Sequence, residues 1–433
     1  MTARTLEQWL EWMEVNHPSQ IDLGLDRVRA VAGRMGPLID TTAPGRPRVI
    51  TVAGTNGKGS CVAALEAMFI AAGQRVGAYT SPHLFSYNER VRIDAAAVDD
   101  ASLCRAFEAV RAAMADISLT YFEFGTLAAF WLFAQADLDV WLLEVGLGGR
   151  LDAVNLIDAD VAIITSIDLD HQDWLGDSRE AIGREKAGVF RSGRAAICAD
   201  PAAPASVGDY ARQIQAQWLP VSEAWDFNAS SDHWSWRPPV GCGAPALVDL
   251  PLPDLPLPSV AAALTAFALI MADLQPGGWP ALRQAVVEGL EAARLPGRFE
   301  RLRYRDIEVI FDVGHNPHAA RWLATRLAQQ PAPTRAVFAM MGDKDRDGVI
   351  AALASAIDDW YVGELGGNVR AAPSAALAVA LCQQGLRVHT TDSVEEAWEA
   401  ALRDCQPGQR ILVFGSFFTV AALRSRVLDA AAA

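Results

Sequence analysis

Residues 54–60 carry the pattern of a loop that binds phosphate, GTNGKGS. Glycines at this spacing let backbone N–H groups close around an anion, and the lysine can contact the phosphates. Such loops normally place a serine or threonine directly after the lysine, because its hydroxyl is a ligand of the nucleotide's magnesium ion. Gly59 stands there instead. The segment is therefore either a plain glycine-rich turn or a phosphate site whose missing metal ligand comes from elsewhere in the chain.

The surroundings of the loop favour phosphate binding. A strand-like run precedes it and a helix-period run follows it, and the N-terminus of a helix adds a favourable dipole for an anion. We predict that the whole loop forms the phosphate site. Its residues are Gly54, Thr55, Asn56, Gly57, Lys58, Gly59 and Ser60.

Lysine is rare in this chain. Of 37 basic residues, only Lys58, Lys186 and Lys344 are lysines. Arginine stays charged, whereas lysine can lose its proton and react. The three lysines are therefore candidates for tasks that arginine cannot perform, with chance or codon bias as the alternative.

Three polar residues follow predicted strands and could supply the missing metal ligand: Ser81, Glu144 and His171. Sites in open α/β sheets form beyond the carboxyl ends of the strands, so these side chains are expected to meet the phosphate loop. Magnesium prefers hard oxygen ligands, and an imidazole can also serve. From the pattern alone, a helix cap for Ser81, a buried ion pair for Glu144 and a surface position for His171 remain open.

The composition limits the class of protein. A formal charge of −15 argues against a nucleic-acid partner, because phosphate backbones require a basic face. The N-terminus lacks a signal-peptide pattern, and the apolar stretch at residues 124–134, taken as the longest, is too short to span a membrane. The six scattered cysteines indicate buried thiols in a reducing cytoplasm.

Short apolar runs alternate with helix-period segments, which predicts a mostly parallel sheet flanked by helices. The pattern weakens at 200–258, where turns and a small antiparallel excursion are expected, and then resumes. We predict an α/β protein with two domains. The first, 1–295, is a P-loop NTPase-type domain, and the second, 296–433, is a smaller Rossmann-like α/β domain.

Seven segments together resemble the folylpolyglutamate synthase family, which is related to the Mur ligases. The similarity runs nearly end to end and is strongest to the bifunctional bacterial members that also make dihydrofolate. The segments are GTNGKGS, TSPHLFSYNERVRID, SLTYFEFGTLAAFWLF, LEVGLGGRLDAVN, SIDLDHQDWLG, IGREKAGVFR and FDVGHNPHAA.

The resemblance implies an ATP-dependent ligase that adds L-glutamate to dihydropteroate and to the glutamate tail of reduced folates through an acyl phosphate. A folylpolyglutamate synthase without the dihydropteroate activity, a Mur-type amino-acid ligase and a non-catalytic nucleotide- or folate-binding module are the alternatives. A merely binding protein would not need Lys58 together with a set of metal ligands. We also expect a monomer in the cytoplasm, with small-molecule partners only and no membrane association.

By the same resemblance, Lys58 contacts the β and γ phosphates of ATP, Ser81 and Glu144 hold one Mg²⁺, and His171 holds a second. Ser81 thus takes the place left vacant by the glycine of the loop. Lys186 matches a lysine that carries a carbamate, which is formed from a neutral amine and carbon dioxide and supplies an anionic oxygen to the metal. The alternative for Lys186 is a helix-surface lysine paired with a neighbouring glutamate.

The resemblance places a pterin site near these residues. An aromatic face for stacking and a carboxylate for the amino-pyrimidine edge suit a pterin. Phe122 and Asp152 supply them, unless Phe122 is core and Asp152 is a loop cap. The full folate set is Thr120, Phe122, Asp152, Ser81, Pro82 and His83.

In the second domain, Arg298 and Asp312 match positions that contact ATP, and His315 matches a catalytic residue close to the phosphates, with a purely structural histidine as the alternative. The chain departs from its relatives at Ser259, where an asparagine near the adenine is usual, and at Phe418, where a histidine is common. Nucleotide and metals are expected between the two domains.

Overall fold

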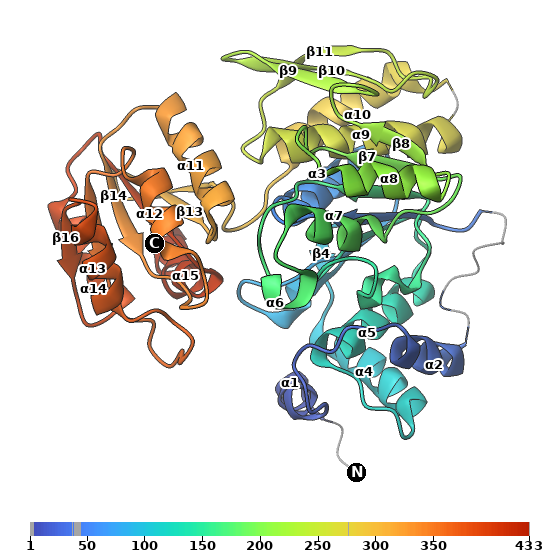
Figure 1. Ribbon diagram of the computed structural model, residues 1–433, viewed down its shortest axis with the longest axis horizontal. Coiled ribbons are helices and arrows are strands. Elements are labelled where there is room, and N and C mark those ends of the chain that lie inside the picture. The colour runs from blue at the N-terminus through green and yellow to red at the C-terminus, as the bar shows by residue number, and fades with distance from the viewer. Residues whose placement is uncertain (1–3, 37, 39–44, 276, 433) are drawn as a thin grey trace. The chain divides into compact units, whose positions relative to one another are not determined.

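The computed structural model describes residues 4–36, 38, 45–275 and 277–432 (Figure 1). The chain forms two compact units, Met1–Ala293 and Arg294–Ala433. The sequence places the division after residue 295, in the segment where helix α10 (Trp279–Ala292) ends before Pro296. Each unit contains its own sheet and its own apolar core.

The first unit is built on an eight-stranded sheet with the order β4-β3-β2-β5-β1-β6-β7-β8. All neighbours pair in parallel except β2–β3 and β3–β4, which confirms the expected α/β class. The strands are β1 (Arg48–Ala53), β2 (Val76–Tyr79), β3 (Val91–Ile93), β4 (Ala96–Ala97), β5 (Val140–Glu144), β6 (Val161–Ile164), β7 (Ala195–Cys198) and β8 (Gln217–Pro220).

Helices cover this sheet, and two short 3-10 helices accompany them. The helices are α1 (Leu6–Val15), α2 (Asp26–Met35), α3 (Lys58–Ala71), α4 (Asp100–Met114), α5 (Tyr121–Gln135), α6 (Gln172–Leu175), α7 (Arg179–Ala187), α8 (Ala205–Gln213), α9 (Leu257–Leu274) and α10, with η1 (Tyr87–Arg90) and η2 (Ala153–Leu156). Parallel strands need crossover connections of this kind, so helices are required between them.

Helix α9 corrects one expectation from the sequence. It is longer than the 124–134 stretch, and its length and hydropathy of 1.8 would let it cross a membrane. Within the protein, however, 67% of that apolar window is buried, because α9 packs against α3 and the sheet. Its apolar character is therefore that of a core helix.

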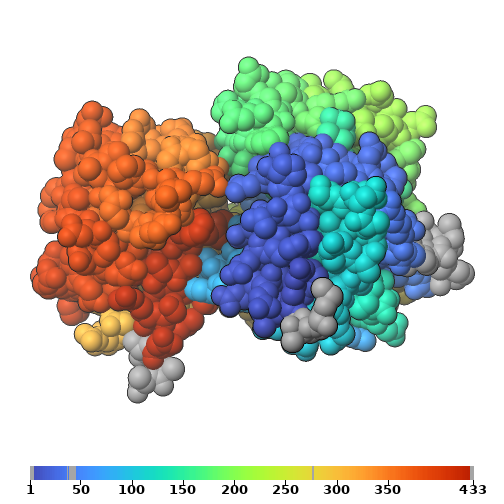
Figure 2. Space-filling view, turned by 90° about the horizontal axis from the view of Figure 1, so that it is seen from below, coloured from blue at the N-terminus to red at the C-terminus, as the bar shows by residue number. Residues whose placement is uncertain are grey.

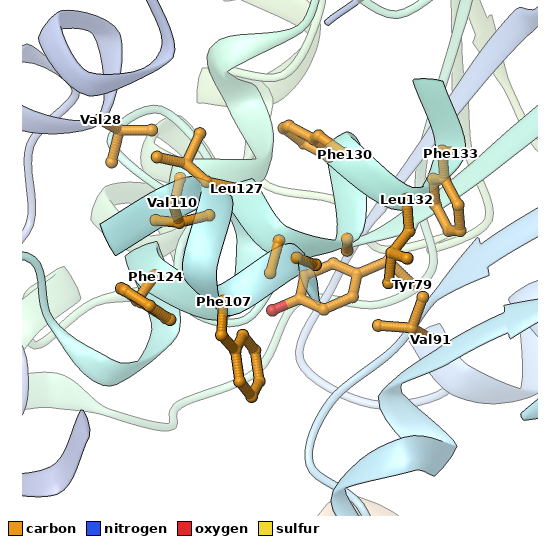
Figure 3. Packing of buried hydrophobic residues seen from close by; sticks show 14 of the residues in the cluster. Val28, Tyr79, Val91, Phe107, Val110, Phe124, Leu127, Phe130, Leu132 and Phe133 are labelled. Carbon is orange, nitrogen blue, oxygen red and sulfur yellow. The ribbon is translucent and has the colours of Figure 1, made fainter. Parts of the chain in front are cut away.

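One packed cluster of the first unit joins α1, α2, α4 and α5 to the face of the sheet (Figure 3). Aromatic rings dominate it: Trp9 lies 6.0 Å from Phe107 and 6.2 Å from Phe124, measured between ring centroids. Figure 2 shows the blue N-terminal segment and the cyan segment of α4 and α5 side by side on one face of this unit. This cluster fixes the start of α5, which carries part of the site described below.

The antiparallel excursion expected at 200–258 is a three-stranded sheet in the order β11-β10-β9. Its strands are β9 (Asp226–Ala229), β10 (His233–Arg237) and β11 (Leu247–Pro251). It lies against α9 and α10, as Figure 1 shows. Buried tryptophans Trp234 and Trp236 attach it to that layer.

The second unit has a six-stranded sheet with the order β12-β13-β17-β14-β15-β16. Only the β12–β13 pair is antiparallel, as expected for a Rossmann-like domain. The elements are β12 (Glu300–Tyr304), β13 (Ile307–Asp312), α11 (Pro317–Gln329), β14 (Thr334–Phe338), α12 (Arg346–Leu353), β15 (Asp359–Val362), α13 (Ser374–Gln383), β16 (Val388–Thr390), α14 (Val394–Asp404), β17 (Arg410–Phe414) and α15 (Phe417–Ala432).

All six cysteines are free thiols. The expectation that they are buried holds for Cys61, Cys198 and Cys242, but Cys382 is exposed. Cys104 and Cys405 are partly exposed.

Candidate active site

The phosphate loop connects β1 to α3, as its sequence predicts. The helix begins at Lys58, and Gly57 before it adopts a left-handed conformation with φ of 84°. The Lys58 ammonium folds back onto the loop, where its Nζ donates to the carbonyl oxygens of Gly54 at 3.0 Å and Thr55 at 3.3 Å. The lysine is thus held over the loop in a position where an incoming phosphate could take over its hydrogen bonds.

Hydroxyl groups at the end of β6 hold the loop from the other side. Thr165 Oγ1 donates to the carbonyl oxygen of Asn56 at 2.7 Å, and Ser166 Oγ donates to the same oxygen at 3.1 Å. The C=O and N–H of a trans peptide point in opposite directions, so the Gly57 N–H faces away from these hydroxyls. The space behind Gly54 is filled as well, because a Cβ there would lie 1.9 Å from Thr165 Oγ1.

Replacing Thr165 by valine is expected to raise the KM for ATP about fivefold, because one hydrogen bond that orients the loop is worth about 1 kcal/mol. Thr51→Val is the matched control: Thr51 is also buried, but its Oγ1 has no hydrogen-bond partner among the described residues. ATP titrations of both variants check this. Equal KM values for Thr165→Val and Thr51→Val would show that the hydroxyl does not orient the loop.

A small cavity of about 30 Å³ opens beside the loop. It is large enough for about two water molecules, or for a group the size of a carboxylate. It is lined by Gly54, Thr55, Lys58, Val145, Gly146, Leu147, Gly148, Asp170, His171, Leu175 and Lys186. The fold therefore brings together two of the three lysines and two of the predicted metal ligands, His171 and Lys186 as a carbamate.

Lys186 lies on α7 and is only 4% exposed. Burial, reinforced by the positive charge of Lys58, lowers the pKa of Lys186 to about 7. Near neutral pH a large share of this side chain is a neutral amine. The alternative of a surface lysine paired with a glutamate is wrong, because Glu185 pairs with Arg150 and Glu180 accepts from backbone N–H groups of α8.

The other predicted metal ligands lie at strand ends. Glu144 is the last residue of β5 and is 5% exposed. The Ser81 N–H donates to its Oε2 at 3.3 Å, so the two predicted ligands of one metal are neighbours. His171 precedes α6 as its N-cap residue in a left-handed conformation, and its side chain is 46% exposed. Across the described residues, no group of three or more His, Cys, Asp and Glu side chains could hold a metal ion.

A second and larger cavity of about 310 Å³ adjoins these residues, within the size range of small-molecule sites. It contains six of the predicted residues: Ser81, Pro82, Thr120, Phe122, Asp152 and His171. It shares Gly146, Leu147 and His171 with the small cavity beside the phosphate loop. The acceptor and phosphate residues predicted from the sequence are therefore contiguous.

His83 does not line this cavity. Its Nδ1 accepts a hydrogen bond from Arg90 Nε at 2.8 Å. Burial and the positive charge of Arg90 lower the pKa of His83 to about 4, so the imidazole is neutral at physiological pH. His83 therefore contacts the site through Arg90, and not directly.

The cavity residues also support the local backbone. Asp152 is 3% exposed, and its carboxylate accepts from the N–H groups of Leu147 at 2.8 Å and Val154 at 3.0 Å. Burial raises the pKa of Asp152 to about 7. Thr120 caps α5 through a hydrogen bond from the Glu123 N–H. Asp152 and Thr120 therefore each cap a backbone segment and also line the cavity. For Asp152, the sequence had presented these two roles as alternatives.

Several cavity residues were missed at the sequence level. They are Gln20, Ile21, Asp22, Leu23, Gly24, Arg90, Tyr121, Glu123, Gly146, Leu147, Leu151 and Ala153. Arg90, Tyr121 and Leu147 fall within the quoted motifs, so those motifs were a signal. The segment before α2 carried no chemical signal in the sequence.

The predicted nucleotide residues of the second unit surround the end of β13. The Asp312 carboxylate is buried and accepts from the N–H groups of Phe299 at 2.9 Å and Gly314 at 2.7 Å, and burial raises its pKa. The Arg298 guanidinium lies 5.4 Å from the centroid of the Phe417 ring. His315 Nδ1 lies 2.9 Å from the carbonyl oxygen of Val313.

The two residues that depart from the usual family pattern have different environments. Ser259 is buried at the start of α9 behind the phosphate loop, where a Cβ on Gly57 would lie 2.2 Å from its Oγ. Phe418 is 55% exposed on α15 of the second unit. Lys344 lies near Asp343, with 4.0 Å between Nζ and Oδ2.

Known proteins resemble this chain along its whole length. Residues 297–417 match the family described as Mur ligase, glutamate ligase domain. The dihydrofolate synthase/folylpolyglutamate synthase of Escherichia coli (strain K12) is 45% identical over 430 residues, which cover 99% of this chain and 96% of that protein.

Solved structures are similar as well. E. coli FolC in complex with DHPP and ADP has a TM-score of 0.90 and 43% identity, covering 100% of this chain and 99% of that one. The bifunctional folylpolyglutamate synthase/dihydrofolate synthase of Yersinia pestis, complexed with AMPPNP and Mn ion, has a TM-score of 0.89 and 44% identity, covering 98% of each chain.

Proposed function

The chain belongs to the dihydrofolate synthase/folylpolyglutamate synthase family of ATP-dependent ligases, and we propose that it joins L-glutamate to dihydropteroate and to the glutamate tail of reduced folates. The reaction proceeds through an acyl phosphate, which the amine of glutamate attacks. Small molecules are its partners. We place it in the cytoplasm as a monomer.

One observation carries this proposal: the phosphate loop and the acceptor cavity are adjacent. The small cavity with Lys58 and Lys186 shares lining residues with the 310 Å³ cavity that contains Phe122 and Asp152. A carboxylate of an acceptor held in the larger cavity can therefore approach a γ-phosphate on the loop. Phosphoryl transfer needs mainly this positioning and the neutralisation of charge.

In the first unit, different residues bind the phosphates and the metal ions. Lys58 exchanges its bonds to the loop carbonyls for the β and γ phosphates of ATP, and the Gly57 N–H adds a fixed donor. Ser81 and Glu144 would hold one Mg²⁺, and His171 a second, because hydroxyl, carboxylate and imidazole are suitable ligands. When bound, Mg²⁺ supplies neutralisation of the phosphate charge.

The proposed metal set would gain a further anionic oxygen, beside the carboxylate of Glu144, from a carbamate on Lys186. Carbon dioxide adds to the neutral amine, with loss of one proton, and leaves a carboxylate at the end of the side chain. The small cavity around Lys186 has room for such a group, and Lys58 offers a positive charge nearby. A lysine is required here because arginine does not form this product.

In the second unit we propose that Arg298 and Asp312 serve the nucleotide and that His315 acts close to the phosphates. Both Asp312 oxygens already accept backbone N–H groups. Asp312 therefore also stabilises the turn that carries His315. Ser259 packs behind the phosphate loop at Gly57. We therefore propose that it supports the loop and does not contact the adenine.

Asp152→Ala is expected to reduce dihydropteroate-dependent turnover more severely than glutamate addition to tetrahydrofolate derivatives. The carboxylate faces the amino-pyrimidine edge of the pterin, and dihydropteroate must be held rigidly for its only carboxylate to reach the phosphate. Steady-state kcat/KM for the two acceptors measures the difference. Equal losses for both acceptors would contradict a selective role.

Asp152→Asn separates recognition from loop support. It keeps the size of the side chain and one of the two oxygens that accept from the N–H groups of Leu147 and Val154. The melting temperature should therefore fall less than in Asp152→Ala, while the dihydropteroate activity falls. An enzyme that extends folates but shows no ATP turnover with dihydropteroate would leave only the narrower folylpolyglutamate synthase function.

A further inference from the structure

The proposed metal ligand Ser81 lies on a different element from the lysine of the phosphate loop. In an ordinary loop of this kind, the hydroxyl that binds Mg²⁺ directly follows the lysine, so one helix start fixes both side chains. Here α3 begins at Lys58, whereas Ser81 lies just beyond the end of β2, and Gly59 carries no hydroxyl. A separate link must therefore hold the segment of Ser81 in place relative to the phosphate loop.

A buried ion pair joins the helix of the phosphate loop to β3. Glu66 lies on α3, about two helical turns after Lys58, and is 6% exposed. Arg92 lies on β3, and it donates to the Glu66 carboxylate from Nε at 3.0 Å and from Nη2 at 2.8 Å. Two contacts from one guanidinium fix its plane as well as its position.

The other side of the Arg92 guanidinium holds the segment of Ser81. Its Nη1 donates to Thr80 Oγ1 at 3.0 Å and to the carbonyl oxygen of Glu89 at 3.0 Å. Thr80 directly precedes Ser81 and is 9% exposed. The Thr80 N–H also donates to the carbonyl oxygen of Arg90 at 2.9 Å, so side-chain and backbone contacts fix this segment together.

Glu89 arranges the residues that follow Ser81. Its carboxylate accepts from the N–H groups of Leu84 at 2.7 Å, Phe85 at 2.8 Å and Ser86 at 2.8 Å. Its carbonyl oxygen is the second acceptor of the guanidinium on β3. The ion pair is therefore connected to the chain on both sides of Ser81.

The contacts of Arg92 require an arginine. A guanidinium carries five N–H groups in one plane, and here Nε, Nη1 and Nη2 are all used. A lysine would keep the positive charge beside Glu66, but a point charge on a flexible stem cannot hold Thr80 in the same fixed geometry. The Arg92 side chain is only 17% exposed, which strengthens these hydrogen bonds relative to exposed ones.

We propose that Arg92 is a positioning residue that ties the segment of Ser81 to the helix of the phosphate loop and so sets the place of this metal ligand relative to Lys58. The inference rests on the proposed function, because it takes Ser81 to be a metal ligand. Arg92 acts through Thr80 and Glu89 and does not itself bind the metal.

The test uses Thr80→Val, which removes an acceptor and leaves the pair of Arg92 and Glu66 intact, and Arg92→Lys, which keeps the charge without the planar fork. In complex with a non-hydrolysable ATP analogue, each variant should bind Mn²⁺ about tenfold more weakly than the unchanged protein, as expected for loss of a hydrogen bond from a charged donor. The electron paramagnetic resonance signal of free Mn²⁺ measures this, after subtraction of binding to the analogue alone. The double variant should be no weaker than the weaker single variant, because both changes cut one link.

Arg75→Lys is the matched control. Arg75 pairs with Asp94 at 3.2 Å at the opposite end of β2 and β3, and its side chain is 48% exposed. This variant should bind Mn²⁺ as the unchanged protein does. Melting curves establish that each variant is folded at the temperature of the binding measurement.

The outcomes are distinguishable. Normal Mn²⁺ binding by folded Thr80→Val or Arg92→Lys would overturn the proposal, and so would fully additive losses in the double variant. Weaker binding that follows the melting temperature in every variant, Arg75→Lys included, would overturn it as well, because it would show general destabilisation. Normal Mn²⁺ binding by Ser81→Ala would instead contradict the proposed function, in which Ser81 is a metal ligand.

Discussion

Lys186→Ala is expected to lose nearly all ligase activity, by roughly a thousandfold or more, while remaining folded. The substitution removes the amine on which we propose the carbamate and with it the proposed anionic oxygen ligand of the metal. The small cavity that surrounds Lys186 has room for the lost group to be supplied from solution. A short carboxylic acid such as acetate should therefore restore part of the activity, measured as ADP release at increasing acetate concentration.

Lys186→Arg is the matched control, because it keeps the positive charge and cannot carry a carbamate. It should be as inactive as Lys186→Ala, and acetate should not restore it, since the longer side chain fills the cavity. Crystals of the unchanged enzyme grown with bicarbonate and nucleotide at mildly alkaline pH should show a carbamate. Density ending in a bare amine, or full activity of Lys186→Arg, would contradict the assignment.

Ser81→Ala should lower kcat by roughly 100- to 1000-fold and raise the magnesium concentration needed for activity. Loss of one electrostatic stabiliser from a preorganised site costs roughly 2 to 4 kcal/mol of barrier. The melting temperature should change little, because the hydrogen bond between Ser81 and Glu144 uses the backbone N–H of Ser81 and survives the substitution. Magnesium titrations of turnover, combined with melting curves, check both expectations.

Ser81→Cys makes the same test specific for metal binding. A thiolate is a softer ligand than a hydroxyl, so this variant should work poorly with Mg²⁺ and recover with Mn²⁺ or Cd²⁺. Near-normal turnover of Ser81→Ala at limiting magnesium would contradict the assignment of Ser81 as a metal ligand. The missing ligand next to Gly59 would then have to come from another residue.

The elements that carry a strong local pattern could be predicted from the sequence. The phosphate loop between β1 and α3, the strand end at Glu144 and the antiparallel sheet of β9–β11 all appear where periodicity and turn residues place them. Ser81 and Glu144 could be brought together because parallel strands end at one edge of a sheet.

Side-chain direction and partners could not be read from the sequence. His83 belongs to the same motif as Ser81 and Pro82, yet it turns away from the cavity and binds Arg90. Asp152 both caps a loop and lines the cavity, which local pattern treats as alternatives. The residues before α2 enter the cavity through tertiary packing alone, which leaves no chemical signal in a single sequence.

The bifunctional reaction is tested most directly by measuring ADP release from ATP with dihydropteroate, in the presence and absence of L-glutamate, beside the same measurement with a reduced folate. We expect that both acceptors support ADP release, that sustained turnover requires glutamate, and that each product gains one glutamate by mass. ADP release with the reduced folate but not with dihydropteroate would contradict the bifunctional reaction. ADP release that depends on neither acceptor would contradict it as well.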